Sequence, residues 1–169
     1  MEEIVNRVSK SPLKSVDLED YLDKSERIGF DLKETLFQGL ILREKDFRQF
    51  VKEHDWSQYE GKNVHIFCSV DAIIPSWSFM LLMTRLQPVV NAVVVGTEAD
   101  LEKALIDEAI EKVLQEGYED QKVVIKGCGN VTNREYAYGQ FAKKMLPYVS
   151  SLMYGEPCST VPIYKKRKK

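Results

Sequence analysis

Apolar residues along the chain recur with two periods, which predicts short buried strands separated by amphipathic helices. The runs 64–68, 92–96 and 123–125 are rich in β-branched residues and have the length of buried strands. Helical spacing of apolar residues fills the intervals between these runs. The helix after the second run is the clearest, because Thr97 and Asp100 resemble a capping box at its start.

Two segments of the chain resemble each other and predict an internal duplication. Tyr59–Gly96 and Tyr118–Gly155 each show the pattern strand, helix, strand, and four of their residues match in order. The matched pairs are Tyr59 with Tyr118, Cys68 with Cys128, Pro88 with Pro147, and Gly96 with Gly155. A chance match is the alternative, but the shared order of predicted elements favours a duplication.

This order of elements predicts an α/β fold. We expect a mainly parallel or mixed sheet built from two related strand–helix–strand units, with an N-terminal α+β extension. A chain of 169 residues without a low-complexity linker suggests a single domain. Its expected parts are the extension 1–57, the repeat copies 58–97 and 118–156, and a basic tail 164–169. In the extension, alternation at Ile28 and Phe30 predicts a strand, and helices are predicted at Glu2–Val8 and Glu44–Glu53.

The composition is that of a soluble globular protein, with 44% hydrophobic and 30% charged residues. The formal net charge is −2, and the last five residues are all basic and carry +5, so the rest of the chain carries −7. A short basic tail of this kind is usually solvated. Because the remainder of the chain is acidic, the charge distribution disfavours nucleic acid as a partner.

The apolar stretch Val64–Met83 is long enough to suggest a membrane span. His65, Asp71 and Pro75 interrupt it, and its period changes at the proline, which favours a buried strand followed by a buried helix. The chain also begins with acidic residues where a signal peptide would be basic. We therefore expect a cytoplasmic protein that does not enter a membrane.

The three cysteines are the main candidate site. Cys68 and Cys128 follow predicted strands at matching places in the two copies, and Cys158 comes four residues after the last strand. Ligands of open α/β sheets bind beyond the carboxyl ends of the strands, so we expect the three thiols to face one crevice. Asp71, three residues after Cys68, would supply a fourth ligand. Thiolates select zinc or an iron–sulfur cluster, which are the expected cofactors.

Other features of the sequence favour or disfavour the prediction of this metal site. Helix N-termini after Cys68 and Cys128 would favour the thiolate forms, because they place positive partial charge nearby. The sequence has no Cys-x-x-Cys pair, however, and a cysteine at a strand end is commonly a small buried hydrophobe. The glycine-rich stretch Lys126–Asn130 is similarly ambiguous, since it fits an anion at backbone amides or simply a tight turn.

Longer stretches of the chain resemble a known family. They are FDLKETLFQGLILREKDFRQFVKEHDWSQYEGK, CSVDAIIPSW, IKGC and GEPCSTVPIYKK. Together they are similar to the Bacteroidetes proteins grouped as domain of unknown function family 2480, over nearly the whole chain. The resemblance implies no assigned activity; it implies small cytosolic proteins whose genes often lie near those for iron–sulfur cluster assembly.

The family pattern also marks individual residues of this chain. They are Cys68, Asp71, Pro75, Trp77, Cys128, Gly155, Pro157, Cys158 and Pro162. Asn130 or Val131 stands where the second copy would need an acid to match Asp71. This asymmetry favours one shared site over two identical sites.

Three hypotheses remain open. In the first, Cys68, Asp71, Cys128 and Cys158 hold a metal, and the protein is accessory to metal handling or to iron–sulfur assembly proteins. In the second, the chain is a non-enzymatic homodimeric interaction module with structural cysteines. Apolar residues at Trp77, Phe79, Met80 and Met83, spread widely around one predicted helix, favour self-association. The third is a thiol enzyme with Cys68 as nucleophile and Asp71 assisting, although it lacks an evident histidine base; whether the protein is an enzyme stays open.

Overall fold

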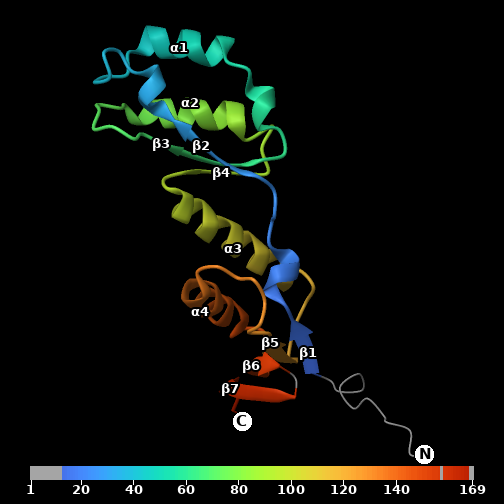
Figure 1. Cartoon of the computed structure of the whole chain (residues 1–169). Helices are drawn as coiled ribbons and strands as arrows, with labels where there is room; N and C mark the ends of the chain where they lie inside the picture. The colour runs from blue at the N-terminus through green and yellow to red at the C-terminus, as the bar shows by residue number, and fades with distance from the viewer. Residues whose placement is uncertain (1–12, 157, 168–169) are drawn as a thin grey trace, which may run out of the picture. The chain divides into compact units, whose positions relative to one another are not determined.

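The chain folds as two compact α/β units (Figure 1). The computed structural model describes residues 13–156 and 158–167, so the predicted helix at Glu2–Val8 lies outside the described residues. Unit 1 combines the chain up to Asp23 with Ile106–Lys169, and unit 2 is Lys24–Leu105. The predicted α/β class with mostly parallel strands is confirmed, although these strands form two sheets instead of one. The expected single domain stays a prediction.

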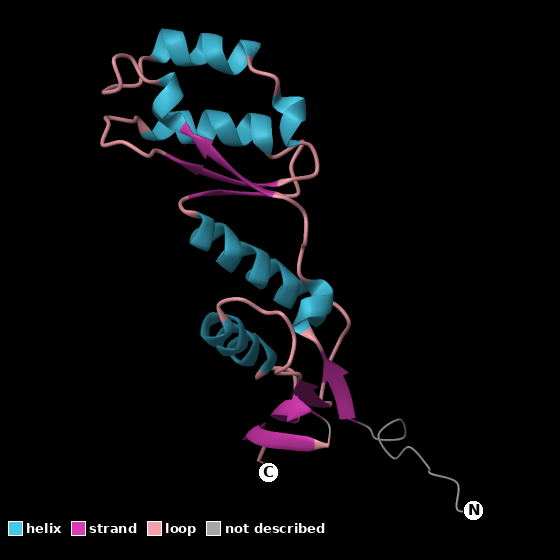
Figure 2. Cartoon of the chain, in the orientation of Figure 1, coloured by secondary structure: helices cyan, strands magenta, loops and turns pink. Residues whose placement is uncertain are grey.

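Unit 2 is a three-stranded parallel sheet in the order β2-β3-β4. Its elements are β2 (Arg27–Asp31), the 3-10 helix η2 (Leu32–Thr35), α1 (Glu44–Glu53), the 3-10 helix η3 (Trp56–Tyr59), β3 (Asn63–Phe67), α2 (Ser76–Leu86) and β4 (Ala92–Val95). Helices α1 and α2 lie on one face of the sheet (Figure 2). Phe47 of α1, Leu82 of α2 and Ile66 of β3 share the buried core on that face.

Unit 1 is a four-stranded sheet in the order β1-β5-β6-β7, in which only β7 runs antiparallel to its neighbour. Its elements are β1 (Leu13–Val16), the 3-10 helix η1 (Leu18–Tyr21), β5 (Lys122–Ile125), α4 (Arg134–Met145), β6 (Ser151–Glu156) and β7 (Ser159–Lys165). Phe141 and Met145 of α4 pack with Val123 of β5 and Leu152 of β6 in its core.

Helix α3 (Glu98–Leu114) contributes residues to both units. Leu101 and Leu105 pack against Ala92 of β4, and Ile110 belongs to the core of unit 1. The predicted capping box at its start is confirmed. The Thr97 N–H donates to Asp100 Oδ2 over 2.8 Å, and the Asp100 N–H donates to Thr97 Oγ1 over 3.3 Å.

The other predicted helix boundaries are confirmed in part. Helix α1 has the predicted bounds Glu44–Glu53. Pro75, where the period of the apolar residues changes, is the residue that precedes α2. Asn133 stands at the N-cap position of α4 in a left-handed conformation, and its side chain makes no capping hydrogen bond. Among the described residues, no helix is both long and apolar enough to span a membrane.

In both units a strand and a 3-10 helix are followed by a strand, a helix and a strand; unit 2 has α1 and η3 in addition, and unit 1 has β7 and the end of α3. The pairing registers also agree. In unit 2, Asn63 lies between Arg27 and Ala92, and in unit 1, Lys122 lies between Leu13 and Ser151. Whether the two units arose by duplication stays a prediction.

Candidate functional site

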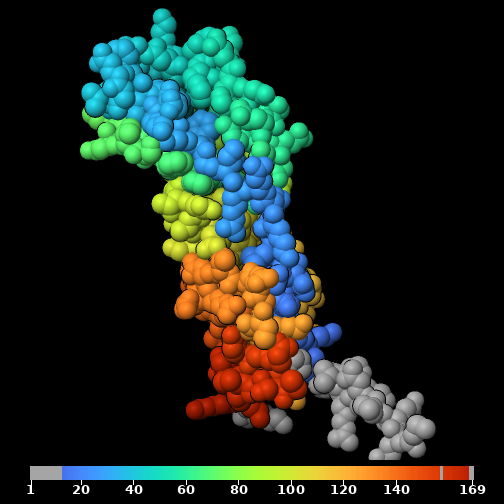
Figure 3. All heavy atoms as spheres, in the orientation of Figure 1, coloured from blue at the N-terminus to red at the C-terminus, as the bar shows by residue number. Residues whose placement is uncertain are grey.

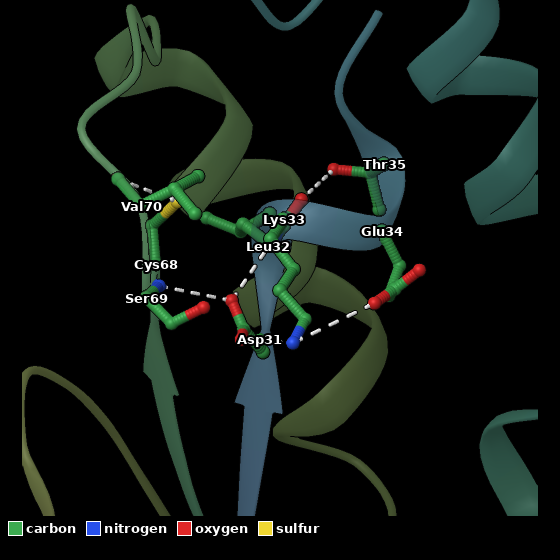
Figure 4. Close-up of polar contacts among 8 residues, drawn as sticks. All are labelled: Asp31, Leu32, Lys33, Glu34, Thr35, Cys68, Ser69 and Val70. Carbon is green, nitrogen blue, oxygen red and sulfur yellow. Dashed lines mark hydrogen bonds and ion pairs between the residues drawn. The ribbon is translucent and has the colours of Figure 1, made fainter. Parts of the chain in front are cut away.

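The carboxyl edge of the sheet in unit 2 is held together by Asp31, the last residue of β2. Its Oδ1 accepts the N–H of Lys33 over 3.0 Å, which caps η2, and the N–H of Ser69 over 3.1 Å, which fixes the loop after β3 (Figure 4). Burial by itself would raise the pKa of Asp31, but the hydrogen bonds from Ser69 and Lys33 and the charge of Lys33 lower it overall. The carboxylate is therefore ionised at neutral pH and ties the two loops together.

Cys68 is half-buried beside this aspartate and packs against the core of unit 2. Its thiol donates to the carbonyl oxygen of Val70, with Sγ 3.3 Å from that oxygen (Figure 4). Asp71, the expected partner of this cysteine, is an exposed residue of the same loop. The thiol of Cys68 thus stabilises the loop after β3.

A tight turn follows η2 in the same unit. The N–H of Leu40 donates to the carbonyl of Phe37 over 3.1 Å, and the N–H of Phe37 donates to the carbonyl of Ile41 over 2.8 Å. Gln38 and Gly39 between them have positive φ values of 51° and 70°, the combination found in a type I′ turn. This turn projects Leu40 from the body of unit 2, with 63% of its surface exposed.

The turn pairs with the loop after β3. Ile73 donates its N–H to Leu40 over 2.9 Å, and Leu42 donates its N–H to Ile73 over 3.2 Å. Exposed apolar residues gather on this pair of loops, which lie side by side in the space-filling view (Figure 3, light blue and green). They are Phe37, Leu40, Ile41, Val70 and Ile73, between 39% and 69% exposed, and we call them the apolar loop surface.

Sequence patterns did not predict the apolar loop surface. The run Leu36–Leu42 is apolar enough for a buried strand. The one signal for a turn within it is the Gln38–Gly39 pair, and glutamine is an unusual residue at a positive φ.

The carboxyl edge of the sheet in unit 1 is polar by contrast. Asp17, after β1, accepts the N–H of Glu19 over 3.2 Å and pairs with Lys126 over 3.7 Å. Glu19 in turn accepts the N–H of Asn130 over 2.7 Å. A carboxylate of the chain itself therefore binds a backbone amide of the glycine-rich stretch, and the stretch serves as a turn anchored to η1.

Cys128 lies exposed in this polar edge. A hydrogen bond to Glu156 and the charge of that carboxylate raise its pKa, with smaller contributions from burial and Asp17 and an opposing one from Arg134. The net shift favours the thiol form of Cys128, opposite to the thiolate expected from the helix that follows it. Cys158 is also exposed and lies in the connection between β6 and β7.

A family model described as "Protein of unknown function (DUF2480)" matches residues 2–166 of the chain. The chain belongs to this family. The match confirms the family predicted from the sequence and assigns no activity. Comparison with curated proteins and comparison with solved structures gave no match.

The metal site predicted for this DUF2480 chain assumed that three strand ends belong to one sheet. That assumption is wrong, because Cys68 and Asp71 follow a strand of unit 2, whereas Cys128 and Cys158 follow strands of unit 1. Within residues 13–156 and 158–167, no three His, Cys, Asp or Glu side chains are arranged to hold a metal ion. The predicted ligand set and its zinc or iron–sulfur cofactor therefore have no support from this geometry.

Both histidines of the DUF2480 chain belong to unit 2 and pack against aromatic rings. The ring centre of His54 is 4.7 Å from that of Trp56, and its Nε2 is 3.2 Å from the hydroxyl oxygen of Tyr59. Burial lowers the pKa of His54, and the charge of Asp55 opposes this effect. His65 stacks on Phe67, with ring centres 5.2 Å apart. These contacts are structural.

Proposed function

We propose that the protein is a non-enzymatic protein-binding module whose contact surface is the apolar loop surface of unit 2. The observation that carries the proposal is the exposure of Leu40 and Ile73, 63% and 69%, on loops whose backbones are hydrogen-bonded to each other. Contiguous exposed apolar patches on soluble proteins commonly mark interaction sites.

The backbone of the apolar loop surface supports this proposal. Gln38 adopts a left-handed conformation that is unfavourable for a residue with a Cβ atom, by about 1 kcal/mol. The result of this strain is a turn that presents Leu40 to solvent in a fixed position. A fixed surface loses little conformational entropy when a partner binds, which favours affinity.

The polar groups next to the surface have structural partners, which favours binding over catalysis. The carboxylate of Asp31 accepts two backbone N–H groups, and the thiol of Cys68 donates to a carbonyl in its own loop. In unit 1, Glu156 favours the protonated form of Cys128, which is the less nucleophilic form.

The test is the double variant Leu40→Ser/Ile73→Ser, compared with Val161→Ser/Ile163→Ser on β7. The β7 residues are 58% and 54% exposed, so both pairs remove similar apolar surface. We expect the loop variant to bind much less of an apolar fluorescent dye such as bis-ANS than the β7 variant does, while its urea midpoint stays at the wild-type value. A clear loss of stability in the loop variant would show that Leu40 and Ile73 contribute to the packing of the core, and the proposal would fail.

A further inference from the structure

We infer that the partner of the apolar loop surface is a second copy of this chain, which binds through the same surface. This inference rests on the proposed function and specifies its partner. In a two-fold symmetric dimer, one surface patch meets itself, so the patch must be compatible with its own charge and shape.

The charge of the apolar loop surface meets this condition. The segment 36–42 has no charged residue, and the segment 68–75 has only Asp71. Flanking charges are paired within the chain: Lys33 lies 3.8 Å from Glu34, and Arg43 lies 2.5 Å from Asp46. A partner selected by charge would require a patch of one sign. The five residues of the surface are uncharged and are bordered by neutral pairs, with Asp71 as the one charge in their two segments, so the surface can meet its own copy with little repulsion.

The shape of the apolar loop surface is also compatible with its own copy. Phe37 is the antiparallel bridge partner of Ile41, and Ile41 is the parallel bridge partner of Ile73. Bridge partners project their side chains to the same side, so these three residues form a short apolar strip. The guanidinium carbon of Arg43 lies 3.6 Å from the ring centre of Phe37 and covers one end of the strip. Two such strips can pack face to face.

Two other surfaces within the described residues, on α2 and on β7, are less suitable for binding a second copy. On α2, Trp77, Phe79 and Met83 pack against the core of unit 2, and only Met80 of the four residues that suggested self-association is largely exposed. That self-association stays a prediction, and α2 is not the surface that supports it.

The edge strand β7 exposes Val161 and Ile163. Pro162 between them has no N–H, and the pairing of β7 with β6 is irregular at Leu152/Met153. Proline and an irregular register are features that protect edge strands from pairing with another chain. A second copy is therefore more favourably bound at the apolar loop surface than at β7.

The experiment measures the mass of the full chain in solution by sedimentation equilibrium at micromolar concentration. We expect the wild type to be a dimer, and Ile73→Glu and Ile73→Lys each to weaken dimerisation at least tenfold, because each places like charges in the strip. An equimolar mixture of the two variants should recover the dimer, since opposite charges then face each other. Val161→Glu on β7 is the matched control and should remain dimeric.

Three results would overturn the inference. They are a monomeric wild type, a mixture of the Ile73 variants that stays monomeric, and a Val161→Glu variant that dissociates while both Ile73 variants remain dimeric. A monomeric wild type leaves the proposed function standing if Leu40→Ser/Ile73→Ser still loses dye binding at unchanged stability. If that double variant unfolds instead, the proposed function itself fails, whatever the mass of the wild type.

Discussion

The carboxyl edges of the two sheets share a capping arrangement of the backbone but expose side chains of different chemistry, polar in unit 1 and apolar in unit 2. In each unit an aspartate at the end of the first strand caps a 3-10 helix: Asp17 accepts the N–H of Glu19, and Asp31 accepts the N–H of Lys33. Beyond these caps, unit 1 exposes a thiol and charged groups, whereas unit 2 exposes the apolar loop surface. The comparison shows that backbone requirements fix the frame and that the loops determine the chemistry presented to solvent.

The largest expected effect on stability comes from alanine substitution at two glycines, which stand at matching places near strand ends. Gly96 and Gly155 have φ values of 145° and 117°. A Cβ atom at Gly155 would stand 2.6 Å from the backbone oxygen of Ser159, and at Gly96 it would stand 2.6 Å from the side-chain oxygen Oδ2 of Asp100. We expect Gly155→Ala to destabilise the chain by about 3 kcal/mol and Gly96→Ala by about 1 to 2 kcal/mol, because only a side chain can rotate away.

Urea unfolding of the two glycine variants checks this order. Far-UV circular dichroism reports on both units, whereas tryptophan fluorescence reports on unit 2, since Trp56 and Trp77 both belong to it. Equal losses in the two variants would contradict the difference between a backbone and a side-chain obstacle.

The next effect compares the two capping aspartates. Asp31 accepts N–H groups from two loops, whereas Asp17 accepts one N–H; each also forms an ion pair with a lysine, Lys33 at 3.8 Å and Lys126 at 3.7 Å. We expect Asp31→Ala to destabilise the chain by about 2 kcal/mol and Asp17→Ala by about 1 kcal/mol, measured by urea unfolding at neutral pH.

The asparagine variants are the controls for this pair, because asparagine keeps an oxygen acceptor. Asp31→Asn should recover part of the lost stability. The lowered pKa of Asp31 means that its contribution is complete above its usual value of 3.8 and is lost as the pH falls through the folded-state pKa. If Asp31→Ala lowers the free energy of unfolding no more than Asp17→Ala does, the hydrogen bond from Ser69 to Asp31 does not contribute to stability.

Hydrophobic periodicity predicted most of these strands and helices, because both kinds of element bury apolar residues at fixed intervals. It placed β3, β4, β5 and α1, for which the local pattern is strong. It did not separate the strands into two sheets, since that division depends on β1 pairing with β5, a contact between residues more than 100 positions apart.

The candidate site was less predictable for the same kind of reason. The pKa of Cys128 depends on Glu156, which stands 28 positions later on another strand. The apolar loop surface depends on the positive φ of Gln38, which glutamine rarely adopts. The spacing of residues along the sequence detects neither feature, and the Gln38–Gly39 pair is the one local signal for the turn.

The polar edge of unit 1 can be tested through the reactivity of Cys128. Glu156→Gln removes the charge that raises the pKa of this thiol, so the thiolate fraction at pH 8 increases. We expect iodoacetamide to alkylate Cys128 several-fold faster in this variant, as followed by mass spectrometry of the peptide that contains it. Cys68 in the same sample is the internal reference and should react at an unchanged rate. An unchanged rate at Cys128 would mean that Glu156 does not control the thiol.

The smallest effect is a pH dependence confined to unit 2, which holds both histidines. Burial among Phe50, Trp56 and Tyr59 lowers the pKa of His54 below its usual value of 6.5, while the neighbouring charge of Asp55 opposes the shift. The unfolded chain therefore binds a proton at His54 more readily than the folded chain does. Stability falls as the pH drops below 6.5 and levels off below the folded-state pKa.

Comparison of wild type with His54→Gln isolates this histidine. Between pH 7.5 and pH 5.5, the urea midpoint from tryptophan fluorescence should decrease more in the wild type than in the variant. Glutamine keeps a polar group near the hydroxyl of Tyr59 but does not titrate. A wild-type midpoint that rises on acidification, relative to the variant, would mean that the folded state favours the charged imidazole, and the packing around His54 would then have to be polar instead of aromatic.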